Sequence, residues 1–409
     1  MYEFILRTLL GTFQFQVMND LQLTAVQFAF LSTTMFQLVY GLMQIPIGML
    51  IDAWGLKKTL LAATLLCTIA TLGFSLTQNF IVAILFRMLM GLGASCGFIC
   101  VLIAIYDWMP RKNIGLFIGI SQFIATIGPM LAAGPLSSML SQSHLSWRTI
   151  FSNLALIGGI ISVFVFFYVN NNRQQTAKFM ILSHSSSLFG RLGHLIKQKQ
   201  IWLIAIYSAS IYFSIEYLTE NEGVGFLVAK GFSATFSSYM ITLAWLGHAL
   251  FCPLLGYLSD KTQRRTPFMY VSSIIMLVAI IGIIYVPLSE TLLAICFILI
   301  GLGASSASIG FAIMADQCKE NSLAAGIGIN NTMIVVSSSF IAPLIGYVLS
   351  HASGGNMVRL GHYQEGFVIM VILVLVASFI SIFWIKETFC KSTCTNTIVN
   401  PTNNDYLRA

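Results

Sequence analysis

Charged side chains are scarce in this sequence. Asp, Glu, Lys and Arg make up 9% of its 409 residues, whereas hydrophobic residues make up 57%. A water-soluble domain has roughly a quarter of its residues charged, which covers its surface. The composition therefore excludes a soluble globule and indicates that a lipid bilayer surrounds most of the chain. Apolar runs of about 20 residues match the helix length that crosses a bilayer, so we expect an all-α integral membrane protein.

Several chemical signatures are also missing. The sequence has no Gly-rich Walker loop, which argues against ATP hydrolysis as its energy source. No nucleophile with a base and no metal-ligand cluster can be assembled from the spacing, so we expect no enzyme, no cofactor and no metal. Six of the eight cysteines lie in or beside apolar runs and fit small core residues. Cys390 and Cys394 lack nearby histidines and are expected to be a reduced pair rather than a zinc site.

The apolar runs are arranged as an internal repeat. Gly48–Asp52 reappears in altered form as Gly256–Asp260, 208 residues later, and Gly91–Ser95 reappears as Gly301–Ser305. In the first pair, an apolar run ends in a G-x-L-x-D turn before basic residues, as where a membrane helix meets the cytoplasm. The runs predict twelve helices in two sets of six: 1–18, 25–51, 59–76, 80–106, 113–139, 149–169, 201–220, 235–259, 267–287, 291–314, 323–350 and 365–385.

The repeat predicts two pseudo-symmetric six-helix bundles. Residues 1–169 form the first and 201–388 the second, while the polar stretch 170–200 is a cytoplasmic linker and 389–409 a cytoplasmic tail. Subtracting the repeat offset from the start of the seventh helix places the first helix start about seven residues before Met1. The first helix is therefore expected to be truncated, either because the true start lies upstream or because this helix is short.

The placement of basic residues predicts orientation. Of the 21 Lys and Arg residues, only Arg148, Lys230 and Arg359 fall in loops on one side, and most others fall on the opposite side. The positive-inside rule makes that opposite side cytoplasmic, with both termini there, in a membrane expected to be the bacterial inner membrane. The net charge of +7 is thereby explained by topology, and no nucleic-acid partner is expected.

The turn after the second predicted helix carries a family resemblance. Gly48, Leu50, Asp52, Gly55, Lys57 and Lys58 resemble the signature of the major facilitator superfamily, and the resemblance covers essentially the whole chain. Ala53 departs from it, since the family usually has a basic residue there. The resemblance implies two bundles that rock to expose a central cavity alternately. It also implies a gate at the helix ends, to which we assign Gly48, Asp52, Gly55, Lys57, Lys58, Asp107, Gly256, Asp260 and Arg264, with Asp316 in a position similar to Asp107.

Few charges lie within the predicted membrane helices, and each is a functional candidate because an intramembrane charge costs about 2.5–3.5 kcal/mol on insertion scales. Arg7 is suited to hold an anionic substrate group, unless it forms a structural bridge with Glu3, one turn away. Arg87 with Gly91 and Gly93 resembles the family's fourth-helix motif, and three roles are open for it: holding an anionic group, assisting proton coupling or ordering helix packing.

Proton coupling is predicted for Glu216, Arg87 and His248. A carboxylate in an apolar cavity, such as Glu216 with Glu220 on the same helix face, titrates in a range where a pH gradient can drive a cycle. Glu216 at a solvated extracellular mouth is the alternative. His248 is either a titrating group or a packed neutral imidazole.

Polar side chains on the cavity-lining helices are candidates for substrate binding. With Arg7 they are Gln14, Gln37, Tyr40, Gln122, Asn330 and Asn331, and Gln44 and Tyr207 share their character. Interhelical hydrogen bonding is the alternative for most of them.

The sequence thus predicts a monomeric secondary transporter that takes up a small polar solute, such as an amino acid or nucleoside, with protons. The ends of the chain, Tyr2–Phe4 and Ile385–Cys390, resemble a nutrient-uptake branch of intracellular proteobacteria. The partly antiporter-like glycines of the fifth helix favour the alternative, an exporter of a siderophore or drug. A transporter-like receptor is a third interpretation.

Overall fold

The computed structural model describes residues 1–23, 27–28, 30–110, 113–133, 146–170, 193, 195–318, 322–353 and 358–391. The side chains of Gln14, Asp52 and Glu220 are among those that lie outside the description. The predicted linker, 170–200, and tail, 389–409, fall largely outside the described residues. Every regular element in the described ranges is a helix.

The helices follow the predicted order. The N-terminal group contains α1 (Tyr2–Thr12), α2 (Gln14–Asp20), the π-helical η1 (Phe30–Thr34), α4 (Met35–Trp54), α5 (Leu56–Leu76), α6 (Phe80–Trp108), α7 (Ile114–Ala133) and α9 (Trp147–Tyr168). The C-terminal group contains α12 (Lys199–Glu220), α13 (Gly223–Ala229), α14 (Ala234–Thr262), α15 (Thr266–Tyr285), α16 (Glu290–Ser305), α17 (Ala307–Asp316), α18 (Leu323–Ser353) and α19 (Leu360–Phe383). Within the described residues, 10 helical segments are long and apolar enough to cross a membrane. The all-α membrane fold predicted from the composition is therefore confirmed.

The first helix is short. Its start lies level with the middle of α6 and α9, where the Tyr2 hydroxyl donates to the carbonyl oxygen of Leu154 (3.1 Å) and Glu3 lies against Gly97. A break at Phe13 separates α1 from α2, and a second break at Ser306 divides the tenth predicted helix into α16 and α17. The seven-residue helix α13 was not predicted, because its run is too short to be distinguished from a loop.

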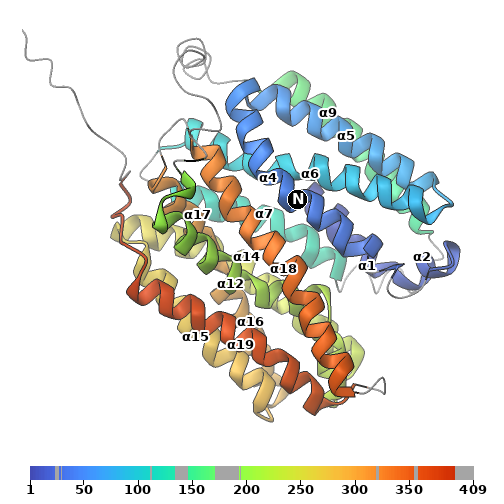
Figure 1. Cartoon of the computed structure of the whole chain (residues 1–409), viewed down its shortest axis with the longest axis vertical. Helices are drawn as coiled ribbons and strands as arrows, with labels where there is room; N and C mark the ends of the chain where they lie inside the picture. The colour runs from blue at the N-terminus through green and yellow to red at the C-terminus, as the bar shows by residue number, and fades with distance from the viewer. Residues whose placement is uncertain are drawn as a thin grey trace, which may run out of the picture.

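The two groups of helices lie side by side (Figure 1). The helix α7 packs on α14, and α4 packs on α18. At the first crossing a side chain on Gly256 would overlap the carbonyl of Gly115, and one on Gly119 would overlap the carbonyl of Cys252. Small residues permit such backbone contact between membrane helices. The glycines of α7 and α14 therefore set the distance between the two groups.

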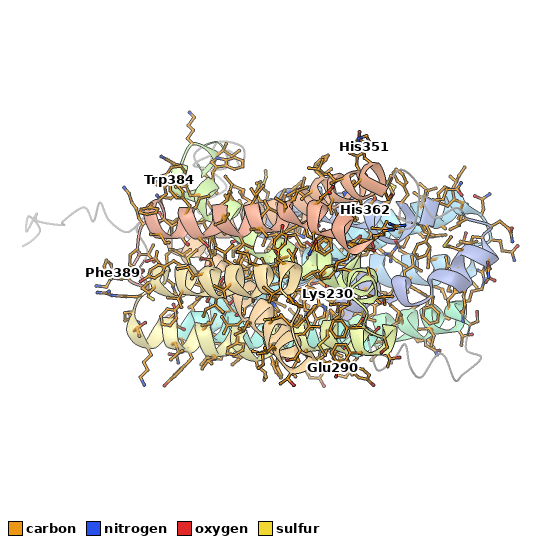
Figure 2. The ribbon with its side chains drawn as sticks, turned by 90° about the horizontal axis from the view of Figure 1, so that it is seen from below. Lys230, Glu290, His351, His362, Trp384 and Phe389 are labelled. Atoms are coloured by element: carbon orange, nitrogen blue, oxygen red, sulfur yellow. The ribbon has the colours of Figure 1, made fainter. Side chains whose placement is uncertain are left out.

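The repeated turn ends a helix in each group at a residue with a positive φ. Gly55 follows α4 with φ 85° and ψ 159°, and Gln263 follows α14 in the left-handed helical region, with φ 53° and ψ 36°. Exposed basic side chains surround these turns, including Lys58, Lys261 and Arg264. We call this end of the bundle the basic end. Trp384 and Phe389 lie at this end, whereas His351 and His362 lie away from it (Figure 2).

Candidate functional site

A buried ion pair joins the two groups of helices. Nη2 of Arg7, on α1, donates to Oε1 of Glu216, on α12. The Arg7 side chain is 10% exposed and the Glu216 side chain 2%. A buried charge is costly unless it is paired or hydrogen-bonded, and a charge-assisted hydrogen bond is strong in an apolar surrounding. The pair therefore stabilises the contact between α1 and α12 as long as both charges remain.

Arg7 binds Glu216, on the other group of helices, whereas Glu3 is the local partner that the sequence also allowed. Oε2 of Glu3 is buried against α6 and accepts no hydrogen bond within the described part of the chain. Oε2 of Glu216 has no hydrogen-bond partner there either. A buried, unsatisfied carboxylate oxygen is unfavourable. Each of these oxygens is therefore a place where a proton or a ligand donor lowers the free energy.

Predicted polar residues meet at the crossing of α4 and α18. Nδ2 of Asn331 donates to the Tyr40 hydroxyl (3.4 Å). Oγ of Ser338 donates to Oε1 of Gln37 (3.4 Å), and Oγ1 of Thr332 donates to the carbonyl of Gly41 (3.0 Å). The structure thus brings Gln37, Tyr40 and Asn331 together, in contacts that join the two groups of helices.

Two amides beside this crossing keep their hydrogen-bonding capacity. Gln44, one turn along α4 from Tyr40, and Asn330, next to Asn331, have side chains with no exposed surface. Neither the oxygen nor the nitrogen of either amide has a partner among the described residues. Because a buried amide without partners is costly, these two side chains are the clearest candidates for contact with a polar ligand.

The two other predicted glutamines are less informative. Gln122, on α7, is buried, and its backbone carbonyl accepts from Oγ1 of Thr126 (2.7 Å). Gln14 is the first residue of α2, and its side chain lies outside the described residues. Tyr207 lies inside the C-terminal group, where its hydroxyl donates to the Met269 carbonyl (2.9 Å).

Arg87 binds backbone carbonyls inside the N-terminal group. Its side chain is fully buried, and it donates to the carbonyls of Leu31 (3.1 Å), Leu6 (2.8 Å) and Ser32 (2.6 Å). Its guanidinium also lies 4.7 Å from the Phe36 ring centroid. These bonds join α1 and η1 to α6, which favours the helix-packing interpretation of Arg87 over proton coupling.

His248 is enclosed by other side chains of the C-terminal group. Its ring meets those of Tyr212 (5.7 Å between centroids) and Trp245 (5.8 Å) edge to face. Sγ of Cys252 lies 3.6 Å from Nε2 of His248. Such packing favours the neutral imidazole. Tyr212 lies one turn before Glu216, on the same face of α12.

A cluster of charged side chains lies at the crossing of α7 and α14, at the basic end. Nη1 of Arg265 binds Oδ1 of Asp260 (2.9 Å), and its Nε binds Oδ2 of Asp316 (3.4 Å). Oδ2 of Asp260 accepts the backbone N–H of Leu116, near the start of α7 (2.9 Å). Asp260 therefore connects the C-terminal group to the positive end of a helix in the N-terminal group.

The arginine in this cluster is Arg265, and not the Arg264 to which the gate was assigned from the sequence. Arg264 is exposed, whereas Arg265 has 2% of its side chain exposed. The left-handed Gln263 reverses the chain, and the Arg264 N–H donates to the Ser259 carbonyl (3.2 Å). Two adjacent arginines are alike in sequence, so only the geometry of this turn shows which one faces the aspartates.

Glu387 is a member of this cluster that the sequence reasoning missed. Its carboxylate accepts the backbone N–H groups of Arg265 (3.0 Å) and Thr266 (2.9 Å) and the Thr266 hydroxyl (2.8 Å). Partial burial acts to raise the pKa of Glu387, but these donors outweigh it and hold the pKa below its ordinary value. The neighbouring Thr388 hydroxyl donates to Asp316 (2.8 Å). The segment after α19 is therefore bound to the start of α15.

The remaining gate residues lie along the matching turn of the N-terminal group. Gly48 is buried in α4, and Gly55 ends that helix. Nζ of Lys57 lies 5.7 Å from the Phe166 ring centroid, and Lys58 is exposed. Asp107 is half-buried at the end of α6, and the Asp52 side chain is not among those described.

Comparison with known proteins agrees with this architecture. The family model described as Major Facilitator Superfamily matches residues 2–221 and 223–391. The hexuronate transporter of Bacillus subtilis (strain 168) is 23% identical over 257 residues, 61% of this chain and 59% of the relative. The probable L-galactonate transporter of Escherichia coli (strain K12) is 26% identical over 157 residues, 38% of this chain and 34% of the relative. The chain thus matches less than two thirds of the length of these relatives.

A solved structure matches over a longer range. It is an inward-facing, unoccupied bacterial homolog of the human lysosomal transporter Spinster, with 17% sequence identity and a TM-score of 0.60. The match covers 93% of this chain and 92% of the other. At this identity the likeness shows a shared fold.

Proposed function

The chain belongs to the major facilitator superfamily and is a membrane transporter, and we propose that it takes up a small, carboxylate-bearing solute such as an amino acid together with protons. The observation that carries this proposal is the buried Arg7–Glu216 ion pair between the two groups of helices. In the proposal, residues 1–169 and 201–388 are the two bundles that rock about the site, and one chain is sufficient for transport.

The residues around the ion pair support the choice of solute. Arg7 offers a guanidinium to a carboxylate, and Glu216 offers a carboxylate to an ammonium group, so a zwitterion complements both. Gln44 and Asn330 supply buried amide donors and acceptors that have no partner among the described residues. Two of the relatives are named as transporters of sugar acids, hexuronate and L-galactonate, which also carry a carboxylate.

The same ion pair supports coupling to protons. Oε2 of Glu216 is buried without a hydrogen-bond partner in the described ranges. A proton on this carboxyl removes one charge of the pair, and the bond to Arg7 then becomes weaker. Because the bond joins the two groups of helices, protonation favours their separation and releases Arg7 for the solute. His248 packs on Tyr212, which lies one turn from Glu216 on α12, but this packing supports no titrating role for either residue.

We place the basic end in the cytoplasm, by the positive-inside rule, in the inner membrane of a bacterium. The crossing of α7 and α14 and the Asp260–Arg265–Asp316 cluster then form the cytoplasmic gate. In this conformer the gate is packed, because Asp260 binds the start of α7 across the two groups.

Transport by purified protein in liposomes tests the proposal. Labelled amino acids and sugar acids are supplied in separate pools, with and without an inward proton gradient. Gradient-dependent accumulation in wild type, lost in Arg7→Gln, is expected. The control is Arg359→Gln, an arginine before α19 at the opposite end from the gate. If no pool accumulates in wild type, uptake is excluded.

Export of a drug or siderophore is the second candidate. It rests on Gly128-Pro129 in α7. Gly128 packs closely on α1, because a Cβ added to it would lie 2.9 Å from Cγ1 of Ile5. Loss of preloaded compound from liposomes, driven by protons in exchange, distinguishes export from uptake.

A further inference from the structure

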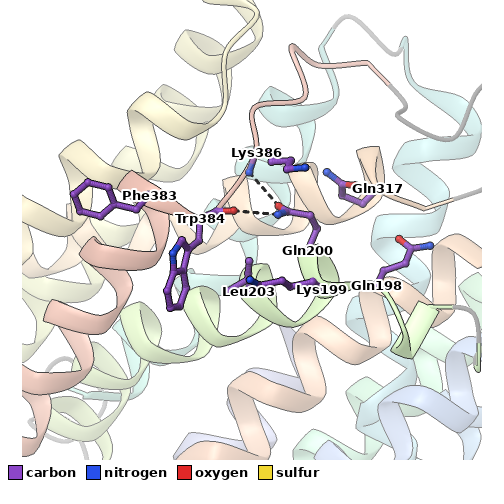
Figure 3. A pocket seen from close by; sticks show the side chains of 8 residues that line it. All are labelled: Gln198, Lys199, Gln200, Leu203, Gln317, Phe383, Trp384 and Lys386. Carbon is purple, nitrogen blue, oxygen red and sulfur yellow. Dashed lines mark hydrogen bonds between the residues drawn. The ribbon is translucent and has the colours of Figure 1, made fainter.

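A pocket opens at the basic end, between the start of α12 and the end of α19 (Figure 3). Its volume is about 530 Å³, within the range of small-ligand sites. Lys199 and Gln198 line one wall, while Trp384 and Lys386 line the other. The pocket lies outside the ion pair and the gate, and neither uses its lysines.

The charge of the lining is positive. None of the described residues that line the pocket is acidic. Lys199 and Lys386 are exposed, and within the described ranges neither forms an ion pair. Nζ of Lys199 lies 5.4 Å from the Trp384 ring centroid, which holds its charge over the aromatic wall. The amides of Gln198 and Gln317 add hydrogen-bonding groups. This lining complements an anion with several oxygen acceptors.

The position of the pocket identifies the source of that anion. Phe383 is 67% exposed and Trp384 48%, at the end of a helix that is long and apolar enough to cross the membrane. Exposed aromatic side chains at a helix end lie at the level of the lipid headgroups. A lipid beside α19 therefore reaches the pocket with its headgroup while its chains stay along the helix.

We propose that this pocket binds the phosphate headgroup of an anionic phospholipid. The phosphate lies between Lys199 and Lys386, and the acyl chains run along Phe383 and Trp384. Basic pockets between membrane helices on the cytoplasmic side have this chemistry.

Lipid at this site contacts the segment that leads to the gate. Nε2 of Gln200 donates to the Trp384 carbonyl (3.0 Å), and the Lys386 N–H donates to Oε1 of Gln200 (3.0 Å), as Figure 3 shows. The next residue is Glu387, which binds the start of α15. A bound headgroup that holds Lys386 thus stabilises the chain one residue before the gate cluster.

The test measures lipid selectivity by fluorescence quenching in nanodiscs. The full chain is placed in phosphatidylcholine discs with rising fractions of phosphatidylglycerol brominated near the headgroup, and brominated phosphatidylcholine serves as the reference lipid. Subtracting the signal of Trp384→Phe isolates Trp384. In wild type, Trp384 fluorescence is expected to be half-quenched at a much lower fraction of brominated phosphatidylglycerol than of brominated phosphatidylcholine. Lys199→Gln with Lys386→Gln is expected to weaken this preference about 25-fold, about fivefold for each lysine.

A control variant and a competition experiment each have a result that would contradict the proposal. Lys58→Gln with Lys261→Gln removes two exposed lysines of the same end that do not line the pocket. An equal loss of selectivity in this control contradicts a localised site and indicates a general surface charge. Inorganic phosphate at millimolar concentration is then added to wild type. If it abolishes the preference for the anionic lipid, the pocket binds a soluble anion and the lipid assignment is wrong.

Discussion

Replacing Gly256 by alanine tests whether the crossing of α7 and α14 holds the gate closed. A Cβ at Gly256 would overlap the carbonyl oxygen of Gly115. It would also lie 2.5 Å from the carbonyl carbon of Gly115 and 3.0 Å from the backbone nitrogen of Leu116. These are backbone atoms that cannot rotate away. The helices must therefore separate, and overpacking of this kind costs about 1–3 kcal/mol.

This cost applies only to the conformer in which the two helices touch. A difference of about 1–3 kcal/mol changes a two-state equilibrium about 5- to 150-fold, so Gly256→Ala is expected to shift the population toward an open basic end. Gly346→Ala on α18 is the matched control, because a Cβ there meets no atom within 4 Å.

The assay is a distance distribution between spin labels at the exposed positions Lys58 and Lys261, in a background without native cysteines. Gly256→Ala is expected to move weight from the short to the long distance, and Gly346→Ala to leave the wild-type distribution. If both variants match wild type, the glycine contact does not hold the gate and the reasoning fails.

Three further predictions follow from named contacts. Arg265→Gln is expected to open the basic end in the same distance assay, while Arg264→Gln leaves it unchanged, because Arg265 binds the aspartates whereas Arg264 is exposed. Wild type is expected to be more heat-stable than Glu387→Gln above about pH 5, and the difference in melting temperature shrinks as pH falls below about 4. The sign follows from a lowered folded-state pKa, whose stabilisation is lost on protonation. A difference that grows in acid contradicts it. In a double-mutant cycle, Arg7→Gln or Glu216→Gln alone is expected to destabilise by about 3–5 kcal/mol and the pair together by less than their sum. Additive losses, measured by unfolding in micelles, exclude a direct interaction.

The fold was predictable because its signals are dense and redundant. Long apolar runs, the repeated turn and glycines at matching offsets all indicate the same helices, and the structure confirms them. The ends of elements were less predictable. A π-helical start before Met35 and the break at Ser306 depend on packing against neighbouring helices, which the hydrophobic pattern does not encode.

The candidate site was predictable in part. Arg7 and Glu216 were identified because an intramembrane charge is costly, yet the sequence suggested no pairing between residues 209 positions apart. Arg87 stood out by the same criterion, although its bonds go to carbonyls whose positions depend on the breaks before α4. Glu387 was missed because its only signal is proximity to the end of the last helix, and its partners lie 121 and 122 residues away.

Proton movement during solute transport is the most direct test of the account. Liposomes contain wild-type protein in the membrane and a pH-sensitive dye inside. The solute that accumulates in the uptake assay is added outside, so that it enters down its own gradient without an imposed proton gradient. Wild type is expected to acidify the interior as solute enters. Glu216→Gln, which imitates the protonated carboxyl, is expected to exchange labelled for unlabelled solute but to move no protons. Acidification by Glu216→Gln at the wild-type ratio of protons to solute would contradict the central role of the Arg7–Glu216 pair.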